Sequence, residues 1–131
     1  MNRHANDAKQ SRRFAIGLYV MAAVWGAMQV SSPDHGDLFL IASLLFAGLA
    51  SGWLAFDSKA QGIKILPILQ MVYFFLWPIG AGVYLVYRSG VRGLLTFLVH
   101  AFGICMTIVI SFYVTLYGLH LTGLLDEAFY Q

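Results

Sequence analysis

Long runs of apolar residues, separated by short polar interruptions, cover most of this 131-residue chain. The runs lie at about residues 14–30, 38–56, 65–87 and 94–117. Each has about the 20 residues that an α-helix needs to cross a hydrocarbon layer of ~30 Å. Backbone polar groups find no water in lipid, so each run must satisfy them internally as a helix. The pattern predicts an all-α integral membrane protein with four transmembrane helices in an up-down bundle.

Composition agrees with this class. The chain is 60% hydrophobic and only 11% charged, unlike an ordinary soluble domain. We expect a single membrane domain over residues 1–131, with a cytoplasmic tail at 1–13, a C-terminal tail at 118–131 and no soluble catalytic module. The net charge of +2 is too small to indicate nucleic-acid binding.

The Lys and Arg residues predict the orientation, because basic flanks stay in the cytoplasm. Four precede the first run, and Lys59 and Lys64 lie in the second interruption. Only Arg88 and Arg92 fall in an interruption that the four-helix arrangement places outside. This six-to-two bias predicts a multi-pass protein of the cytoplasmic (inner) membrane with both termini in the cytoplasm.

Arg88 and Arg92 are the exception to this orientation and need partners outside. The simpler interpretation is that they pair with Asp34 and Asp37 in the first interruption, or extend to lipid phosphates. The functional interpretation is an anion or partner site on the outer face. The sequence leaves both open.

The third run is interrupted by Pro78, with Gly80 and Gly82 directly after it. A proline removes one backbone hydrogen bond, so we expect a kink at this point. In transporters such a break can line a substrate site. Because no charged residue lies in the break, a kink that serves packing is the preferred interpretation.

Small residues predict where helices pack closely. The second run contains the GxxxG sequence Gly48-Leu-Ala-Ser-Gly52, which lets two helix backbones approach. In the fourth run, small and hydroxyl residues recur from Gly93 to Thr122 at helical spacing and form one stripe. A polar lining for an ion or headgroup is the alternative to a packing stripe. The expected helix-packing residues are Gly48, Gly52, Gly103, Thr107 and Ser111.

His100 is the only ionisable residue well inside a run, and such residues are candidates for function. Counting back from the preceding turn, we expect it to face Gly80–Gly82. A ligand or lipid site on the outer half would use His100, Arg88, Arg92 and Tyr84. We expect no catalytic residue, cofactor or metal, because the single Cys105 and the scattered histidines form no known constellation.

No catalytic or transport motif identifies a function. The leading hypothesis is a small non-enzymatic accessory or assembly subunit of a larger membrane complex, or a homo-oligomer. The alternative is a small transporter, or a lipid- or anion-binding membrane protein with its site on the outer half. The expected partners are membrane lipids and other membrane subunits or copies of itself, and no nucleic acid.

Overall fold

The computed structural model describes residues 3–31 and 36–123, which form helices and no strands. The chain runs through five helices in the described ranges. They are α1 (Arg3–Ser31), α2 (Gly36–Ala60), α3 (Pro67–Phe75), α4 (Trp77–Ser89) and α5 (Val91–Leu121).

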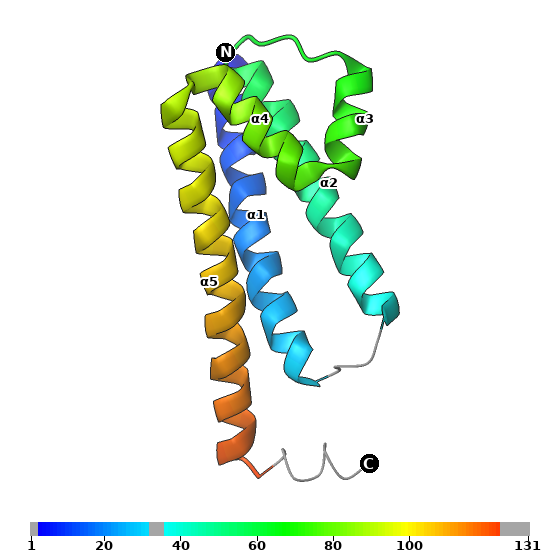
Figure 1. Ribbon diagram of the computed structural model, residues 1–131, viewed down its shortest axis with the longest axis vertical. Coiled ribbons are helices and arrows are strands. Elements are labelled where there is room, and N and C mark those ends of the chain that lie inside the picture. Colours follow the sequence, from blue (N-terminus) through cyan, green and yellow to red (C-terminus); the bar gives the residue numbers. More distant parts are fainter. Residues whose placement is uncertain (1–2, 32–35, 124–131) are drawn as a thin grey trace.

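Three of these helices, α1, α2 and α5, are long and apolar enough to cross a membrane. They contain 29, 25 and 31 residues, so each is about 38 to 47 Å long at 1.5 Å per residue. α1 packs against both α2 and α5 (Figure 1). The all-α prediction is confirmed, and the three apolar helices agree with a small membrane protein.

The prediction of four transmembrane helices in an up-down bundle is wrong, because the third apolar run is divided. Its two helices, α3 and α4, contain 9 and 13 residues, about 14 and 20 Å, and neither could cross ~30 Å of hydrocarbon. α3 runs along α2 toward the middle of the molecule, and α4 returns toward the end from which α3 came (Figure 1). The chain therefore forms a helical hairpin where a spanning helix was expected.

The hairpin turns at Leu76, whose φ of −113° and ψ of 34° lie outside the helical region. Pro78 lies in the first turn of α4, where a backbone N–H would have no carbonyl within the helix to bond to, so the missing N–H costs no hydrogen bond. Leu76 N–H donates to the Val72 carbonyl and so ends α3, while the Leu76 carbonyl accepts from Gly80 N–H in α4. The break was expected close to this position. It reverses the chain where only a kink was expected.

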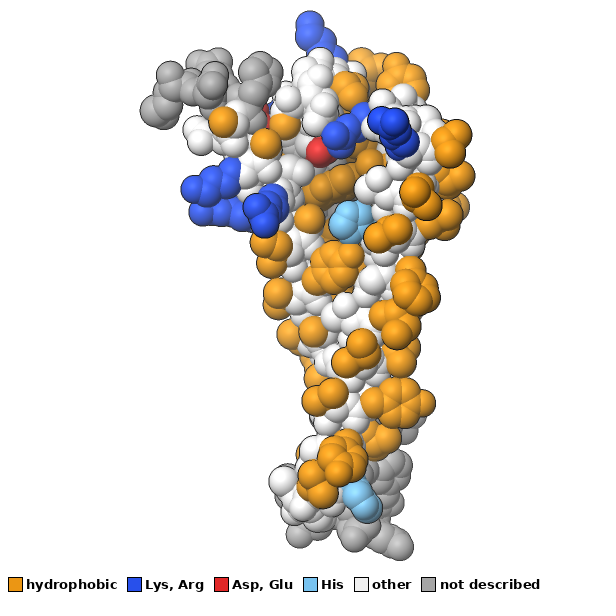
Figure 2. All heavy atoms as spheres, turned by 90° about the vertical axis from the view of Figure 1, so that its left-hand side faces the viewer, with side chains coloured by type: hydrophobic (Ala, Val, Ile, Leu, Met, Phe, Trp, Pro, Cys, Tyr) orange, Lys and Arg blue, Asp and Glu red, His pale blue; other side chains and the backbone are white. Residues whose placement is uncertain are grey.

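This reversal brings all the basic residues to one end of the molecule. α1 begins, α2 ends, α4 ends and α5 begins at this end (Figure 1), and Figure 2 shows the Lys and Arg side chains gathered in the upper part of the molecule. We call it the basic end. Its basic residues are Arg3, Lys9, Arg12, Arg13, Lys59, Lys64, Arg88 and Arg92.

α1 begins at Arg3 at the basic end, and α5 ends at Leu121 at the opposite end of the molecule (Figure 1). The expectation that both termini share the cytoplasmic side is not tested, because the tail at 124–131 lies outside the described residues. Asp37, at the start of α2, is also at the end opposite to Arg88, so the expected pairing between them is wrong. Asp34 lies outside the described residues.

Aromatic packing holds the tip of the hairpin against α2. The Trp77 ring stacks on Phe46 with 5.9 Å between centroids and 9° between planes. Phe46 belongs to a core cluster with Leu18, Ala22 and Ala50. It precedes Ala60, at the end of α2, by 14 residues, so the hairpin tip reaches about 21 Å along α2.

Glycines allow the closest helix contacts. A Cβ at Gly26 of α1 would collide with the Ile108 carbonyl of α5, and one at Gly93 of α5 would collide with the Leu85 carbonyl of α4. In lipid, such backbone proximity is a main source of helix association. α5 is therefore fixed against α1 in its middle and against α4 at its start.

Candidate functional site

A cleft of about 440 Å³ lies between α1, α2, α4 and α5 in the half of the molecule nearer the basic end. Most of its wall is apolar and includes the aromatic rings of Trp53, Trp77 and Phe97. Each of the four helices contributes one alanine to the lining, and these small side chains leave the cleft unfilled. They are Ala15 on α1, Ala50 on α2, Ala81 on α4 and Ala101 on α5.

The cleft has a defined direction along α5. Thr96 and Arg88 line it near the basic end, and Cys105 lines it on the side farther from that end. Thr96 and Cys105 are nine residues apart on one helix, which corresponds to about 13 Å. The cleft is thus elongated along the helix axes, with its only charged lining residue, Arg88, near the basic end.

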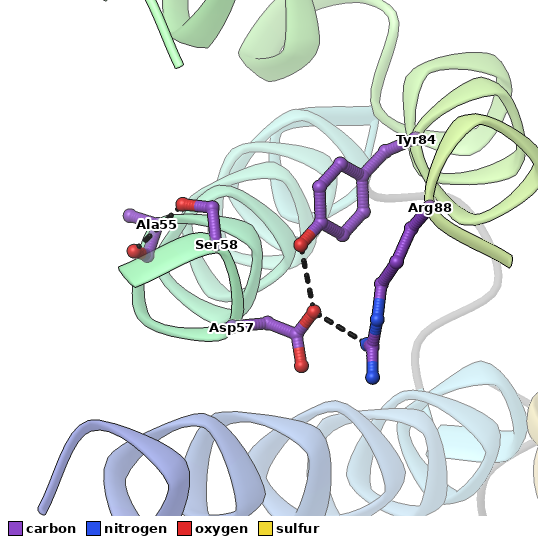
Figure 3. Close-up of polar contacts among 5 residues, drawn as sticks. All are labelled: Ala55, Asp57, Ser58, Tyr84 and Arg88. Atoms are coloured by element: carbon purple, nitrogen blue, oxygen red, sulfur yellow. Dashed lines mark hydrogen bonds and ion pairs between the residues drawn. The ribbon is translucent and has the colours of Figure 1, made fainter. Parts of the chain in front are cut away.

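Arg88 is held by a hydrogen-bonded cluster between α2 and α4 (Figure 3). The Oδ2 atom of Asp57 accepts a hydrogen bond of 2.8 Å from the Tyr84 hydroxyl and forms an ion pair of 2.7 Å with Nη1 of Arg88. Tyr84 and Arg88 are four residues apart, so both lie on the same face of α4. The Trp53 ring packs edge-on against Tyr84 at 6.0 Å.

Burial makes this cluster a structural anchor. Tyr84 is 2% exposed, and the side chains of Arg88 and Asp57 are 28% and 13% exposed. Removing one partner of such a pair would leave a partly buried charge without compensation. The cluster therefore ties the last turn of α4 to the end of α2 and fixes where the guanidinium lies.

A second polar pair joins α1 to α5 at the cleft. The Tyr19 hydroxyl lies 2.9 Å from Nδ1 of His100, and both residues line the cleft. A Cβ at Gly103 would lie 2.8 Å from the Tyr19 hydroxyl, so the glycine leaves the room that the hydroxyl needs. His100 shares the cleft lining with Ala81, which belongs to the Gly80–Gly82 segment that His100 was expected to face. The Tyr73 ring packs on Gly80, and the Phe97 ring lies next to Gly82.

The four residues predicted for a ligand site have three different positions. Arg88 and His100 line the cleft. Tyr84 is buried and bonds to Asp57. Arg92 is exposed in the first turn of α5 and does not belong to the cleft lining. The predicted location on the outer half depended on the four-helix arrangement, whereas these residues lie toward the basic end.

The five residues predicted to pack helices are also divided. Gly52 faces the Phe14 ring, Gly103 faces Tyr19, and Gly48 is exposed with open space around it. Two hydroxyls donate to backbone carbonyls: Ser111 to Ala23 of α1 at 2.6 Å, and Thr107 to Gly103 of its own helix at 2.8 Å.

Sequence reasoning missed Tyr19 and Asp57. Tyr19 is a polar phenol within the first apolar run, and pairing it with the lone intramembrane His100 was an available signal. Asp57 could not be paired with Arg88 as long as the third run was expected to cross the membrane, because crossing would separate the two by its full thickness. The pair forms only because the hairpin returns.

No group of three or more His, Cys, Asp or Glu residues that could hold a metal ion occurs within the described part of the chain. No family model matches the sequence, and no curated protein or solved structure matches it either. The class is therefore defined by the structure: a small all-helical protein with three helices long and apolar enough for a membrane.

Proposed function

We propose that this chain is a non-enzymatic membrane protein that holds one amphiphilic molecule in the cleft between α1, α2, α4 and α5. The observation that carries the proposal is the cleft itself. Its volume of about 440 Å³ lies within the range of about 300–1,000 Å³ that is usual for small-molecule sites. Its walls are apolar, and its few polar groups are Tyr19, Arg88, Thr96, His100 and Cys105. Such a lining suits a ligand with an apolar body and one polar end.

The proposal includes an orientation in the cytoplasmic (inner) membrane. With α1, α2 and α5 as spanning helices, all eight Lys and Arg residues belong to the basic end and none to the other. Basic flanks stay in the cytoplasm, so the basic end is cytoplasmic. The α3–α4 hairpin then enters from the cytoplasmic side and returns to it, and α5 ends on the opposite side.

A substitution that fills the cleft tests the proposal. Ala101 lines the cleft, so Ala101→Phe should occupy the space and exclude a ligand. Val99 is 61% exposed on the same helix and lies outside the cleft lining, so Val99→Phe adds an aromatic ring where it meets lipid. Native mass spectrometry of the full chain, extracted in a mild detergent, should detect one bound amphiphile per wild-type chain. Ala101→Phe should lose it, and Val99→Phe should keep it.

Two outcomes would contradict amphiphile binding. One is a wild-type chain that carries no bound amphiphile under any extraction gentle enough to keep it folded. The other is equal occupancy in both variants, which would place the bound molecule outside the cleft.

A role as an accessory or assembly subunit, or as a homo-oligomer, is a second candidate, supported by one face of α2. There Gly48 is exposed with nothing within 4 Å of a Cβ, and Ile41, Leu44 and Leu45 are at least half exposed around it. A small residue among larger apolar ones lets another helix approach closely. Crosslinking through Gly48→Cys in a Cys105→Ser background should then capture a neighbouring chain. Capture that is no stronger than at Val99→Cys would count against this role.

A further inference from the structure

We propose that the amphiphile is a phospholipid with an anionic headgroup, that Arg88 binds its phosphate, and that one acyl chain lies in the cleft. This inference rests on the proposed function and names the ligand of the same site. It is carried by three observations: the position of the Arg88 guanidinium, the charge of the basic end, and the elongated apolar cleft that continues from Arg88.

The Arg88 guanidinium has hydrogen-bonding capacity left after it binds Asp57. A guanidinium carries five N–H donors in a planar fork, and the ion pair to Asp57 involves Nη1. The Arg88 side chain is 28% exposed and lines the cleft. Asp57 holds it in place from the side of α2. A phosphate suits the remaining donors, because arginine binds phosphate oxygens with two parallel hydrogen bonds.

The surrounding charge favours an anionic over a zwitterionic headgroup. Eight Lys and Arg residues belong to the basic end, whereas its acidic residues within the described ranges are Asp7 and Asp57. The Asp57 carboxylate is already bound by Arg88 and Tyr84. Clusters of basic residues at a membrane surface attract anionic lipids, and the cationic amine of a zwitterionic headgroup would gain nothing from this field.

The cleft accommodates an acyl chain beyond the headgroup. It extends about 13 Å along α5 from Thr96, past His100, to Ile104 and Cys105. The Tyr19 hydroxyl hydrogen-bonds to Nδ1 of His100. When the hydroxyl is the donor, the imidazole carries its proton on Nε2, and His100, which lines the cleft, can donate that N–H to an ester carbonyl of the lipid. The order of groups in a phospholipid, phosphate then ester then chain, follows the order Arg88, His100, Ile104.

The test is a competition between two lipids with identical dioleoyl chains, phosphatidylglycerol and phosphatidylcholine. Equal amounts are added to the delipidated full chain, and native mass spectrometry measures the ratio of the two adducts. Wild type should prefer the anionic lipid about tenfold, the effect of one charge-assisted contact. Arg92→Gln removes the same charge at an exposed position outside the cleft and should keep most of this preference.

Arg88→Gln should reduce the ratio to near one, but it also leaves Asp57 without its cation. The double variant Asp57→Asn with Arg88→Gln removes both charges and avoids an unpaired one. It should stay folded, bind both lipids through the acyl chain, and show no preference. Free sn-glycerol 3-phosphate should not displace the lipid, because it lacks the chain that fills the cleft.

The outcomes separate this inference from the proposed function. If wild type binds both lipids equally, or if the double variant keeps the tenfold preference, the assignment of Arg88 to an anionic headgroup is overturned while amphiphile binding stands. If neither lipid binds, the phospholipid assignment is overturned, and amphiphile binding is then decided by the extraction experiment on the wild-type chain. Displacement by free glycerol phosphate would show that the ligand is a soluble anion, which overturns the lipid assignment.

Discussion

Two polar pairs at the scale of single residues connect helices that are distant in the sequence. Tyr19 and His100 join α1 to α5, and Asp57 joins α2 to α4 through Arg88 and Tyr84. Both pairs lie at or beside the cleft. Each polar group forms a hydrogen bond with its partner and so replaces a bond to water that it loses on burial. The two sets of contacts therefore determine which helix faces pack together and which polar groups line the cleft.

The substitution Gly103→Ala should break the Tyr19–His100 hydrogen bond. The added Cβ would lie 2.8 Å from the Tyr19 hydroxyl, the far end of a flexible side chain, so the hydroxyl is displaced and the helices stay together. The substitution should lower the free energy of unfolding by about 0.5–1.5 kcal/mol, the contribution of one hydrogen bond. The imidazole ¹⁵N signals of His100 should shift in the same direction in Gly103→Ala and in Tyr19→Phe.

Gly118→Ala is the matched control for this substitution, because it lies on the same helix with open space around its Cβ position. It should leave the His100 signals unchanged. If Gly103→Ala also left them unchanged while Tyr19→Phe shifted them, Gly103 would not be what gives Tyr19 its room.

At the scale of elements, the α3–α4 hairpin is fixed by contacts of different kinds. Trp77 stacks on Phe46 at its tip, Arg88 pairs with Asp57 at its base, and Gly93 lets the start of α5 touch α4. The two short helices could not be held by lipid alone, since neither crosses the hydrocarbon layer. Their position depends on these protein contacts.

Adding one methyl group at Gly26, where α1 contacts α5, should destabilise the protein. A Cβ at Gly26 would collide with the Ile108 backbone carbonyl, which cannot move without shifting the helix. Gly26→Ala should therefore lower the free energy of unfolding by about 1–3 kcal/mol, as overpacking does elsewhere. A thermal or denaturant unfolding assay in detergent measures this loss.

Gly48→Ala provides the comparison on α2. It gains the same helix propensity as Gly26→Ala, but its Cβ would meet nothing within 4 Å. It should unfold no more easily than wild type. Equal destabilisation by both substitutions would mean that the collision at Ile108 does not determine the effect.

At the scale of the whole molecule, charge and topology agree only when the hairpin returns. The four-helix arrangement leaves Arg88 and Arg92 on the side opposite the other six basic residues. The observed arrangement places all eight at the basic end, and Figure 2 shows the Lys and Arg side chains of one face gathered there. Because Lys and Arg resist transfer across the membrane, the arrangement with three spanning helices satisfies the orientation rule throughout.

Cysteine accessibility distinguishes the two arrangements directly. In a Cys105→Ser background, single cysteines at Gln61 and Ser89 should react with an impermeant reagent from the same side, and a cysteine at Gly36 from the other. All three positions are exposed. A cysteine at Ser89 that reacts together with Gly36, and separately from Gln61, would restore four spanning helices and refute the re-entrant hairpin.

The sequence alone determined the class of the protein and the places where the chain is interrupted. Runs of about 20 apolar residues predict membrane helices because transfer into lipid depends on composition. The three longest helices follow from this, and Pro78 correctly marked the break in the third run. Intramembrane His100 and basic Arg88 were recognised as candidates by residue type alone, because such groups are costly in lipid.

Only the tertiary structure decided that the third run forms two short helices, α3 and α4, in place of one long helix. A spanning helix and a returning hairpin bury the same apolar residues in lipid, so hydropathy does not separate them. The choice depends on contacts between distant residues, Trp77 with Phe46 and Arg88 with Asp57, which no local pattern encodes. The cleft likewise depends on the tertiary structure, because four helices form its walls. Its polar contacts join residues that are far apart in the sequence. Tyr19 and His100 are 81 positions apart, and Asp57 and Arg88 are 31 apart.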